Sequence, residues 1–216
     1  MSKITETYEQ LLNYTKNLWH DEYHNKLIRY LTQCEIKSYV DVGANIGEVC
    51  NILKFYLPEL KNAYLFEPQL DNYAFMNERY LKIEDVRCFN YGIHYGVTHL
   101  PFYRKNKNID EYSVEKLEED YKLVGEVTQL KTLEEFDLPI VDFIKISAEG
   151  SEENIIKNST YIPKIKYISL DFSRSLHNIE DVEAFCSKYF SKHKIVLMDR
   201  KNVFLEKQGS YLAFKI

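Results

Sequence analysis

Residues 39 to 49 read YVDVGANIGEV. The stretch begins with apolar residues typical of a short buried strand and then contains two glycines, Gly43 and Gly47. Helical periodicity follows at once in NIGEVCNILKFYL. Glycine lets a backbone adopt positive φ and approach a ligand closely, and the first turn of a helix has free N–H groups. The stretch therefore predicts a strand, a tight turn and a helix, with a candidate ligand site at the turn.

The same alternation continues along the chain. Apolar strands are expected at 63–68, 86–92, 141–147 and 166–173, and helical segments at LDNYAFMNERYL, TLEEF, SEENIIKNSTY and DVEAFCSKYF. Strands that alternate with helices indicate parallel βαβ units. KIVLMD and GSYLAFKI are expected to be strands with no long helix between them. The predicted fold class is α/β, a mostly parallel, doubly wound sheet with an antiparallel C-terminal edge hairpin.

One domain with a helical extension is the expected organisation. Residues 4–33 carry apolar positions at helical spacing, with a break near His20 and Asp21, so residues 1–37 are expected to form two helices. Residues 38–216 contain no repeat and no Pro/Gly/Ser-rich linker, and they are expected to form the main domain. Residues 106–126 are charged and show no clear strand, whereas Ser151 is expected to be the N-cap of a helix.

Composition restricts the class of protein. The chain has 216 residues, of which 45% are hydrophobic and 28% charged, as in ordinary globular domains. No run of about 18 apolar residues is present, so we expect no membrane span. The net charge of −5 disfavours a general nucleic-acid binder. The four cysteines are scattered and MSKITETYEQ has no apolar signal region, so we expect a cytoplasmic location.

Two acidic residues indicate which ligand the glycine turn binds. Glu67 ends the second expected strand, where an acid can bind both ribose hydroxyls. NAD sites prefer G-x-G-x-x-G, but this turn reads G-A-N-I-G. Asp41 would repel a pyrophosphate and suits the cationic methionine end of S-adenosylmethionine. The pattern therefore favours S-adenosylmethionine, the structural alternative being a tight turn beside an exposed acid.

Five segments, taken in order, resemble the FkbM-like S-adenosylmethionine-dependent methyltransferases. They are DVGANIGEV, FEP (66–68), FNYGIHYGVTHLPFY, TLEEF and VDFIKISAEGSEENIIKN. The resemblance implies a Rossmann-like class I methyltransferase fold and O-methylation of a hydroxyl on a small acceptor, such as a sugar in a glycan. It also implies a cofactor site that contains Asp41, Gly43, Ala44, Asn45, Gly47, Glu67, Pro68, Asn90 and Tyr91. Glu67 would bind the ribose, and Asn90 and Tyr91 would lie near the adenine.

Catalysis requires a group that removes one proton from the acceptor hydroxyl. The candidates at strand ends are Asp171, Lys145, Glu149 and Ser147, and Asp171 is the preferred base. His94 is a further candidate that is also explained as a turn residue. Glu149 is equally explained as a first-turn acid, and Lys145 as a side chain that reaches solvent at the sheet edge.

The family usually has Asp where this chain has Ser147, and Glu where it has Asp171. Loss of one carboxylate weakens a divalent-cation site, so we predict metal-independent or weakly metal-binding chemistry. His20 and His24 in HDEYH are one helical turn apart, but the residue after the first His is Asp21 and not the Glu of the metalloprotease pattern. We therefore predict no zinc site.

Two other functions remain open at this stage. A catalytically impaired binding or scaffold protein could retain the fold, because Ser147 falls in the most family-specific segment. An NAD-dependent sugar oxidoreductase is disfavoured by the glycine spacing. The expected partner is a small-molecule or glycan acceptor, and oligomeric state cannot be read from the sequence.

Overall fold

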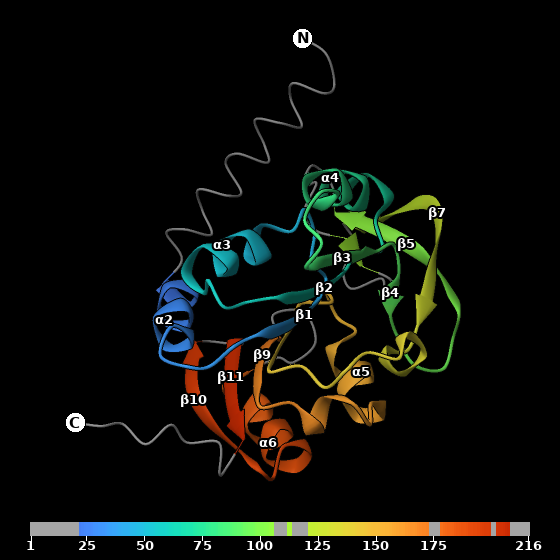
Figure 1. Ribbon diagram of the computed structural model, residues 1–216. Coiled ribbons are helices and arrows are strands. Elements are labelled where there is room, and N and C mark those ends of the chain that lie inside the picture. Colours follow the sequence, from blue (N-terminus) through green and yellow to red (C-terminus); the bar gives the residue numbers. More distant parts are fainter. Residues whose placement is uncertain (1–21, 106–111, 114–120, 173–177, 200–201, 208–216) are drawn as a thin grey trace, which may run out of the picture.

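A seven-stranded sheet forms the centre of the computed structural model, which describes residues 22–105, 112–113, 121–172, 178–199 and 202–207 (Figure 1). Its strand order is β10-β11-β9-β8-β1-β2-β3. The bounds are β1 Ser38–Val42, β2 Asn62–Phe66, β3 Val86–Phe89, β8 Phe143–Ile146, β9 Tyr167–Asp171, β10 His193–Asp199 and β11 Asn202–Lys207. β3, β2, β1, β8 and β9 pair in parallel, and β11 is antiparallel to β9 and β10. The predicted α/β class is confirmed.

Helices cover both faces of this sheet (Figure 1). α2 (Glu22–Leu31), α3 (Glu48–Tyr56) and α4 (Leu70–Tyr80) contribute to one apolar cluster, together with Tyr39, Phe143 and Tyr167 of the sheet. α5 (Glu152–Asn158) and α6 (Ile179–Tyr189) contribute to the other cluster. Successive residues of a strand point to opposite faces, so the near-continuous apolar strands bury both of their sides, as strands of parallel sheets do.

A smaller sheet lies beside β3 and corrects one expectation. It has the order β4-β7-β5-β6, with β4 Gly92–Ile93, β5 His99–Lys105, β6 Tyr112–Ser113 and β7 Tyr121–Lys131. Residues 106–126 showed no clear strand in the sequence, yet β6 and the first half of β7 lie there. β7 pairs along most of its length with β5, and such cross-strand pairing outweighs a weak local pattern.

The end of the chain also differs in detail from the prediction. The hairpin partner of β10 is β11 (Asn202–Lys207), which lies between β9 and β10 in the sheet. GSYLAFKI, which was expected to be that strand, lies beyond the described residues, as does the first expected N-terminal helix. α2 begins at Glu22, just after the predicted break. In the part of the chain that the structure describes, no helix is long and apolar enough to cross a membrane.

Candidate active site at the carboxyl edge of the sheet

The chain changes direction between β1 and β8. From β1 it proceeds to β2 and β3 on one side, and from β8 to β9 on the other. Open α/β sheets bind ligands outside the carboxyl ends of the strands at such a point. Two turns meet here: residues 43–47 after β1 and residues 147–150 after β8. We call them the first and second turns.

The two turns are packed backbone against backbone. Gly43 has φ 79°, and a Cβ atom placed on it would lie 1.9 Å from the carbonyl oxygen of Ser147. The N–H groups of Gly43 and Ala44 both donate to the carbonyl of Phe66, at 3.0 and 2.9 Å. Glycine at position 43 is thus required both by the backbone conformation and by the contact with the second turn.

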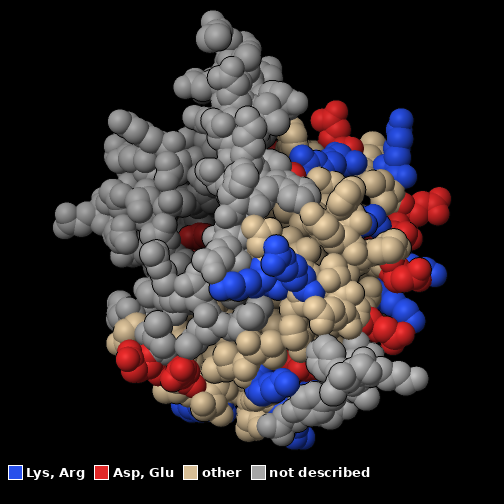
Figure 2. Space-filling view, turned by 90° about the vertical axis from the view of Figure 1, so that its left-hand side faces the viewer, with Lys and Arg blue, Asp and Glu red and all other residues tan. Residues whose placement is uncertain are grey.

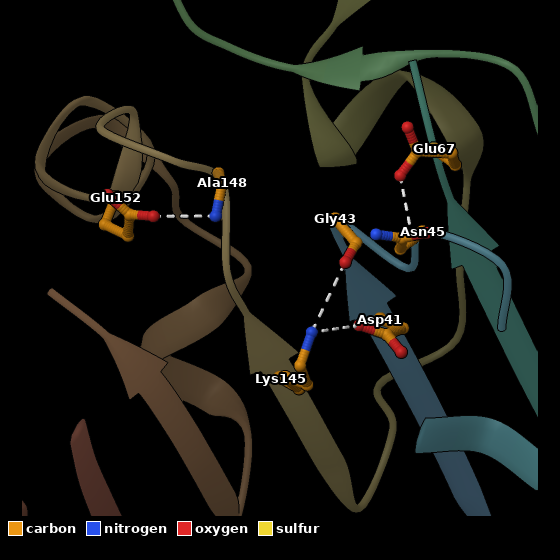
Figure 3. Close-up of polar contacts among 7 residues, drawn as sticks. All are labelled: Asp41, Gly43, Asn45, Glu67, Lys145, Ala148 and Glu152. Atoms are coloured by element: carbon orange, nitrogen blue, oxygen red, sulfur yellow. Dashed lines mark hydrogen bonds and ion pairs between the residues drawn. The ribbon is translucent and has the colours of Figure 1, made fainter. Parts of the chain in front are cut away.

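Glu67 lies next to the first turn, where its carboxylate meets Asn45 (Figure 3). Its carboxylate is buried and accepts hydrogen bonds from the N–H groups of Asn45 (2.7 Å) and Gln69 (2.9 Å). Burial raises the pKa of Glu67 to about 7, although these hydrogen bonds oppose the rise. The Asn90 side chain donates to the carbonyls of Glu67 and Pro68, at 2.9 and 3.1 Å. Glu67 therefore holds Asn45 at φ 52°, and its contact with a ribose stays a prediction.

Asp41 and Lys145 form an ion pair beneath the two turns. The strands pair these residues directly, and Lys145 Nζ lies 2.9 Å from Asp41 Oδ1 and 3.3 Å from the Gly43 carbonyl (Figure 3). Asp41 is fully buried, and its Oδ2 makes no well-formed hydrogen bond although the Tyr39 hydroxyl is nearby. An ammonium in such a pair donates hydrogen bonds and has no lone pair. This geometry favours a structural or binding role for Lys145 over that of a base.

Aromatic rings lie at the ends of β2 and β3. The Tyr91 ring contacts Phe136 of the short helix η1 (Leu133–Phe136), with ring centroids 5.6 Å apart. Phe136 also contacts Phe66 and Phe89, at 4.7 and 5.1 Å. The ammonium of Lys131 lies 4.8 Å from the centre of the Tyr91 ring. This aromatic group suits a flat ligand such as adenine, but the adenine contact of Tyr91 remains a prediction.

Three acids gather at the ends of β8 and β9. Glu149 and Asp171 are partly exposed, and both lie close enough to the buried Glu152 to raise its pKa. Ser147, the fourth proposed catalytic residue, is half-buried in the second turn. The predicted residues Asp171, Glu149 and Ser147 therefore occupy one corner of the site, and Lys145 with Asp41 occupies the base of it.

Glu152 is a residue of this corner that the sequence interpretation missed. Ser151 was expected to cap α5, but its hydroxyl is buried and makes no capping hydrogen bond. Instead Glu152 turns back toward the second turn and accepts hydrogen bonds from the N–H groups of Ala148 and Gly150. The predicted N-cap position of Ser151 is confirmed, but its side chain does not make the capping hydrogen bond. The amides that Glu152 binds precede the helix, so the spacing of the sequence did not indicate this contact.

His94 lies on the segment after β4. Burial lowers its pKa, and its Nδ1 is buried without a hydrogen-bond partner. Among the described residues, no hydrogen bond or ion pair joins its side chain to the acids of the site, so a turn residue stays the simpler interpretation. Within the described ranges, no three or more His, Cys, Asp or Glu side chains are grouped so that they could hold a metal ion. His20 lies outside these ranges, and the side chain of His24 is not described.

A doubly wound sheet with a glycine turn and acids at its switch point is typical of α/β proteins that bind nucleotide cofactors. The family model for the methyltransferase FkbM domain matches residues 41–189, and the chain belongs to this family. The Rossmann-like fold agrees with this membership. No curated protein sequence matches the chain.

Two solved structures show the same fold. The methyltransferase FkbM of Methylobacillus flagellatus KT is 15% identical with a TM-score of 0.59, and the match covers 79% of this chain and 43% of that one. A proposed rRNA methylase of Clostridium thermocellum is 12% identical with a TM-score of 0.52, covering 87% of this chain and 96% of that one. The chain thus spans less than half the length of the first of these proteins.

Proposed function

We propose that this protein transfers a methyl group from S-adenosylmethionine to a hydroxyl of a small acceptor, with a sugar of a glycan as the proposed acceptor class. The observation that carries the proposal is the acidic corner of Glu149 and Asp171 at the ends of β8 and β9, where the second turn packs against the first. A carboxylate is a suitable acceptor for a hydroxyl proton, and these two are partly exposed at the edge where ligands of such sheets bind.

The cofactor would occupy the first turn. Gly43, Ala44, Asn45 and Gly47 would contact its methionine end, Glu67 and Pro68 would lie at the ribose, and Asn90 and Tyr91 at the adenine. Because Lys145 occupies one oxygen of Asp41, the Asp41 charge is partly compensated before any ligand binds. S-adenosylmethionine would supply the methyl group, and the protein would orient the acceptor and remove its proton.

Asp171 is the proposed base, with Glu149 as its neighbour across the second turn. Both side chains interact with other groups, so their role as bases is tested by substitution rather than read from the geometry. Asp171→Asn is expected to lower kcat at least tenfold and to leave affinity for S-adenosylhomocysteine unchanged. Full turnover in this variant would show that Asp171 is not the base.

Calorimetry and a transfer assay test the proposed function itself. S-adenosylhomocysteine is expected to bind and NAD is not. Radiolabelled S-adenosylmethionine is then offered with a panel of free sugars, glycosides and sugar nucleotides. Binding without transfer to any of them would favour the scaffold alternative, and binding of NAD would favour an oxidoreductase.

The transfer assay also tests the role of a metal ion. Methyl transfer is expected to continue after chelation by EDTA, and strict dependence on Mg²⁺ or Mn²⁺ would contradict metal-independent chemistry.

Gly43→Ala tests the position of the cofactor site. The new Cβ would overlap the Ser147 carbonyl, so the two turns must separate and affinity for S-adenosylhomocysteine is expected to fall at least tenfold. Gly96→Ala is the matched control, because Gly96 also has positive φ (103°) but nothing within 4 Å of its added Cβ. Equal losses of affinity for S-adenosylhomocysteine in the two variants would show that the cofactor does not bind at the first turn.

A further inference from the structure

Glu152 combines deep burial with two hydrogen bonds to one turn. The side chain is 1% exposed at the start of α5. Its Oε1 accepts from the Ala148 N–H at 2.6 Å, and its Oε2 accepts from the Gly150 N–H at 2.9 Å (Figure 3 shows the first). One carboxylate thus holds the backbone on both sides of Glu149. Buried carboxylates are costly unless they are hydrogen-bonded, and here the partners belong to the site.

The segment that Glu152 holds has an unfavourable backbone conformation. Glu149 has φ 49° and Gly150 has φ 112°, and a residue with a Cβ rarely adopts the left-handed region that Glu149 occupies. Such conformations persist only where surrounding contacts fix them. Ser151 offers no capping hydrogen bond, so the Glu152 carboxylate is the side chain whose hydrogen bonds bracket this conformation.

The held turn carries a proposed catalytic group. Glu149 projects from it, and both Glu149 and Asp171 interact electrostatically with Glu152. A shift of about 1 Å in a reacting group can cost about 100-fold in rate. The side chain that fixes this turn therefore also fixes the distance between Glu149 and the acceptor.

We infer that Glu152 is a positioning residue of the acceptor site, whose carboxylate fixes the second turn so that Glu149 faces the acceptor beside Asp171. This inference rests on the proposed function. Glu152 acts through the backbone amides of Ala148 and Gly150 and does not itself contact the acceptor.

Glu152→Gln tests the inference, with Glu153→Gln as a matched control on the next residue of α5. An amide retains one acceptor oxygen but replaces the other with an N–H donor, so one of the two bonds to the turn is lost. Glu153 instead pairs with Lys157 on its own helix. Both variants retain the shape of the side chain.

Amide hydrogen exchange gives a readout that needs no acceptor. In Glu152→Gln, exchange at Ala148 and Gly150 is expected to accelerate at least tenfold relative to wild type and to Glu153→Gln, while amides in β1 and β2 are unchanged. Unchanged exchange in the second turn would overturn the inference. If this variant does not fold, Glu152→Asp, which keeps the carboxyl group on a shorter side chain, is measured in the same way.

Kinetics then separate positioning from a purely structural role. With an acceptor identified in the transfer assay, Glu152→Gln is expected to lower kcat about 10- to 100-fold, with affinity for S-adenosylhomocysteine unchanged. An unaltered kcat in the folded variant would overturn the inference. If the wild-type protein methylates no acceptor, the proposed function fails, and the exchange result still decides whether Glu152 fixes the turn.

Discussion

At the scale of single residues, the site depends on buried acidic side chains that are held by specific partners. Asp41 is fully buried and pairs with Lys145, whose side chain is 12% exposed. Glu67 and Glu152 are buried against backbone amides. Removing one partner from such an arrangement leaves a charge that neither water nor protein compensates.

The Asp41–Lys145 pair gives the first prediction at this scale. Lys145→Met is expected to lower the free energy of unfolding by about 3–5 kcal/mol, because the Asp41 charge stays buried and unpaired. The double variant Asp41→Asn/Lys145→Met is expected to recover most of this loss. Urea unfolding measures both, and additive effects of the two substitutions would show that the residues do not interact.

The raised pKa of Glu67 predicts a pH dependence of stability. Its pKa is about 7 in the folded protein and about 4.5 ordinarily, so the folded state retains a proton that the unfolded state loses between these values. The stabilisation that this proton on Glu67 gives the folded state is fully present below about pH 4.5 and is lost as the pH rises through about 7. Glu67→Gln is expected to reduce the fall in unfolding free energy between pH 4.5 and 8 by up to about 3 kcal/mol.

Thermal or urea unfolding across this pH range tests the Glu67 prediction. Glu84→Gln, a change at an exposed position, is the control and should leave the curve of wild type intact. Burial also raises the pKa of Glu152, to about 8. Part of the slope of unfolding free energy against pH should therefore persist in Glu67→Gln. An identical slope in wild type and Glu67→Gln would contradict the prediction.

At the scale of elements, η1 connects the site to the layer of α5. Glu134 of η1 accepts hydrogen bonds from Ser159 Oγ (3.1 Å) and from the N–H groups of Thr160 (2.8 Å) and Tyr161 (3.1 Å). It also accepts one from the Tyr95 hydroxyl. Burial alone would raise the pKa of Glu134, but these hydrogen bonds outweigh it and lower the pKa. One side chain thus joins η1, the segment after β4 and the end of α5.

Glu134→Ala tests this connection. The variant is expected to lose about 1–2 kcal/mol of unfolding free energy, because several hydrogen bonds to a charged group are removed at an exposed position. Glu153→Ala removes only an ion pair within one helix and is expected to cost about 0.5 kcal/mol or less. Urea denaturation measures both, and equal effects would show that Glu134 does not join these elements.

At the scale of the whole molecule, charge bears on the acceptor. The net charge is −5. On the face seen in Figure 2, basic side chains are interspersed with acidic ones, and the described part of that face shows no continuous basic stripe. Nucleic-acid binding relies on such basic surfaces, although one solved structure with this fold is a proposed rRNA methylase.

We therefore predict no tight binding of RNA. Fluorescence anisotropy with labelled rRNA and tRNA fragments at 50 mM salt is expected to show no saturable binding below about 1 µM, the tight limit of the usual non-specific range. A repeat with saturating S-adenosylhomocysteine controls for binding that depends on the cofactor. Micromolar or tighter binding that weakens steeply with salt would contradict the prediction and point to an RNA acceptor.

Local pattern was enough to predict the main sheet apart from β11, and the first turn. Apolar runs, glycines and helical periodicity specify βαβ units because they act over a few residues. β7 was not predicted, because its strand forms by pairing with β5, which begins more than 20 residues earlier in the chain. The sequence likewise placed Asp171, Glu149 and Ser147 at strand ends, where the structure has them.

By itself, then, the sequence determined the α/β class, the strand-glycine-helix unit at Gly43 and the acidic residues at the edge of the sheet. Only the tertiary structure decided what those residues contact. Lys145 meets Asp41 across neighbouring strands, Glu67 binds the backbone of the first turn, and Glu152, rather than Ser151, holds the second turn. The physical reason is that hydrogen bonds and ion pairs depend on interatomic distances, which local periodicity does not encode. The first two contacts join segments far apart in the chain, and the third depends on the left-handed backbone of Glu149 and Gly150.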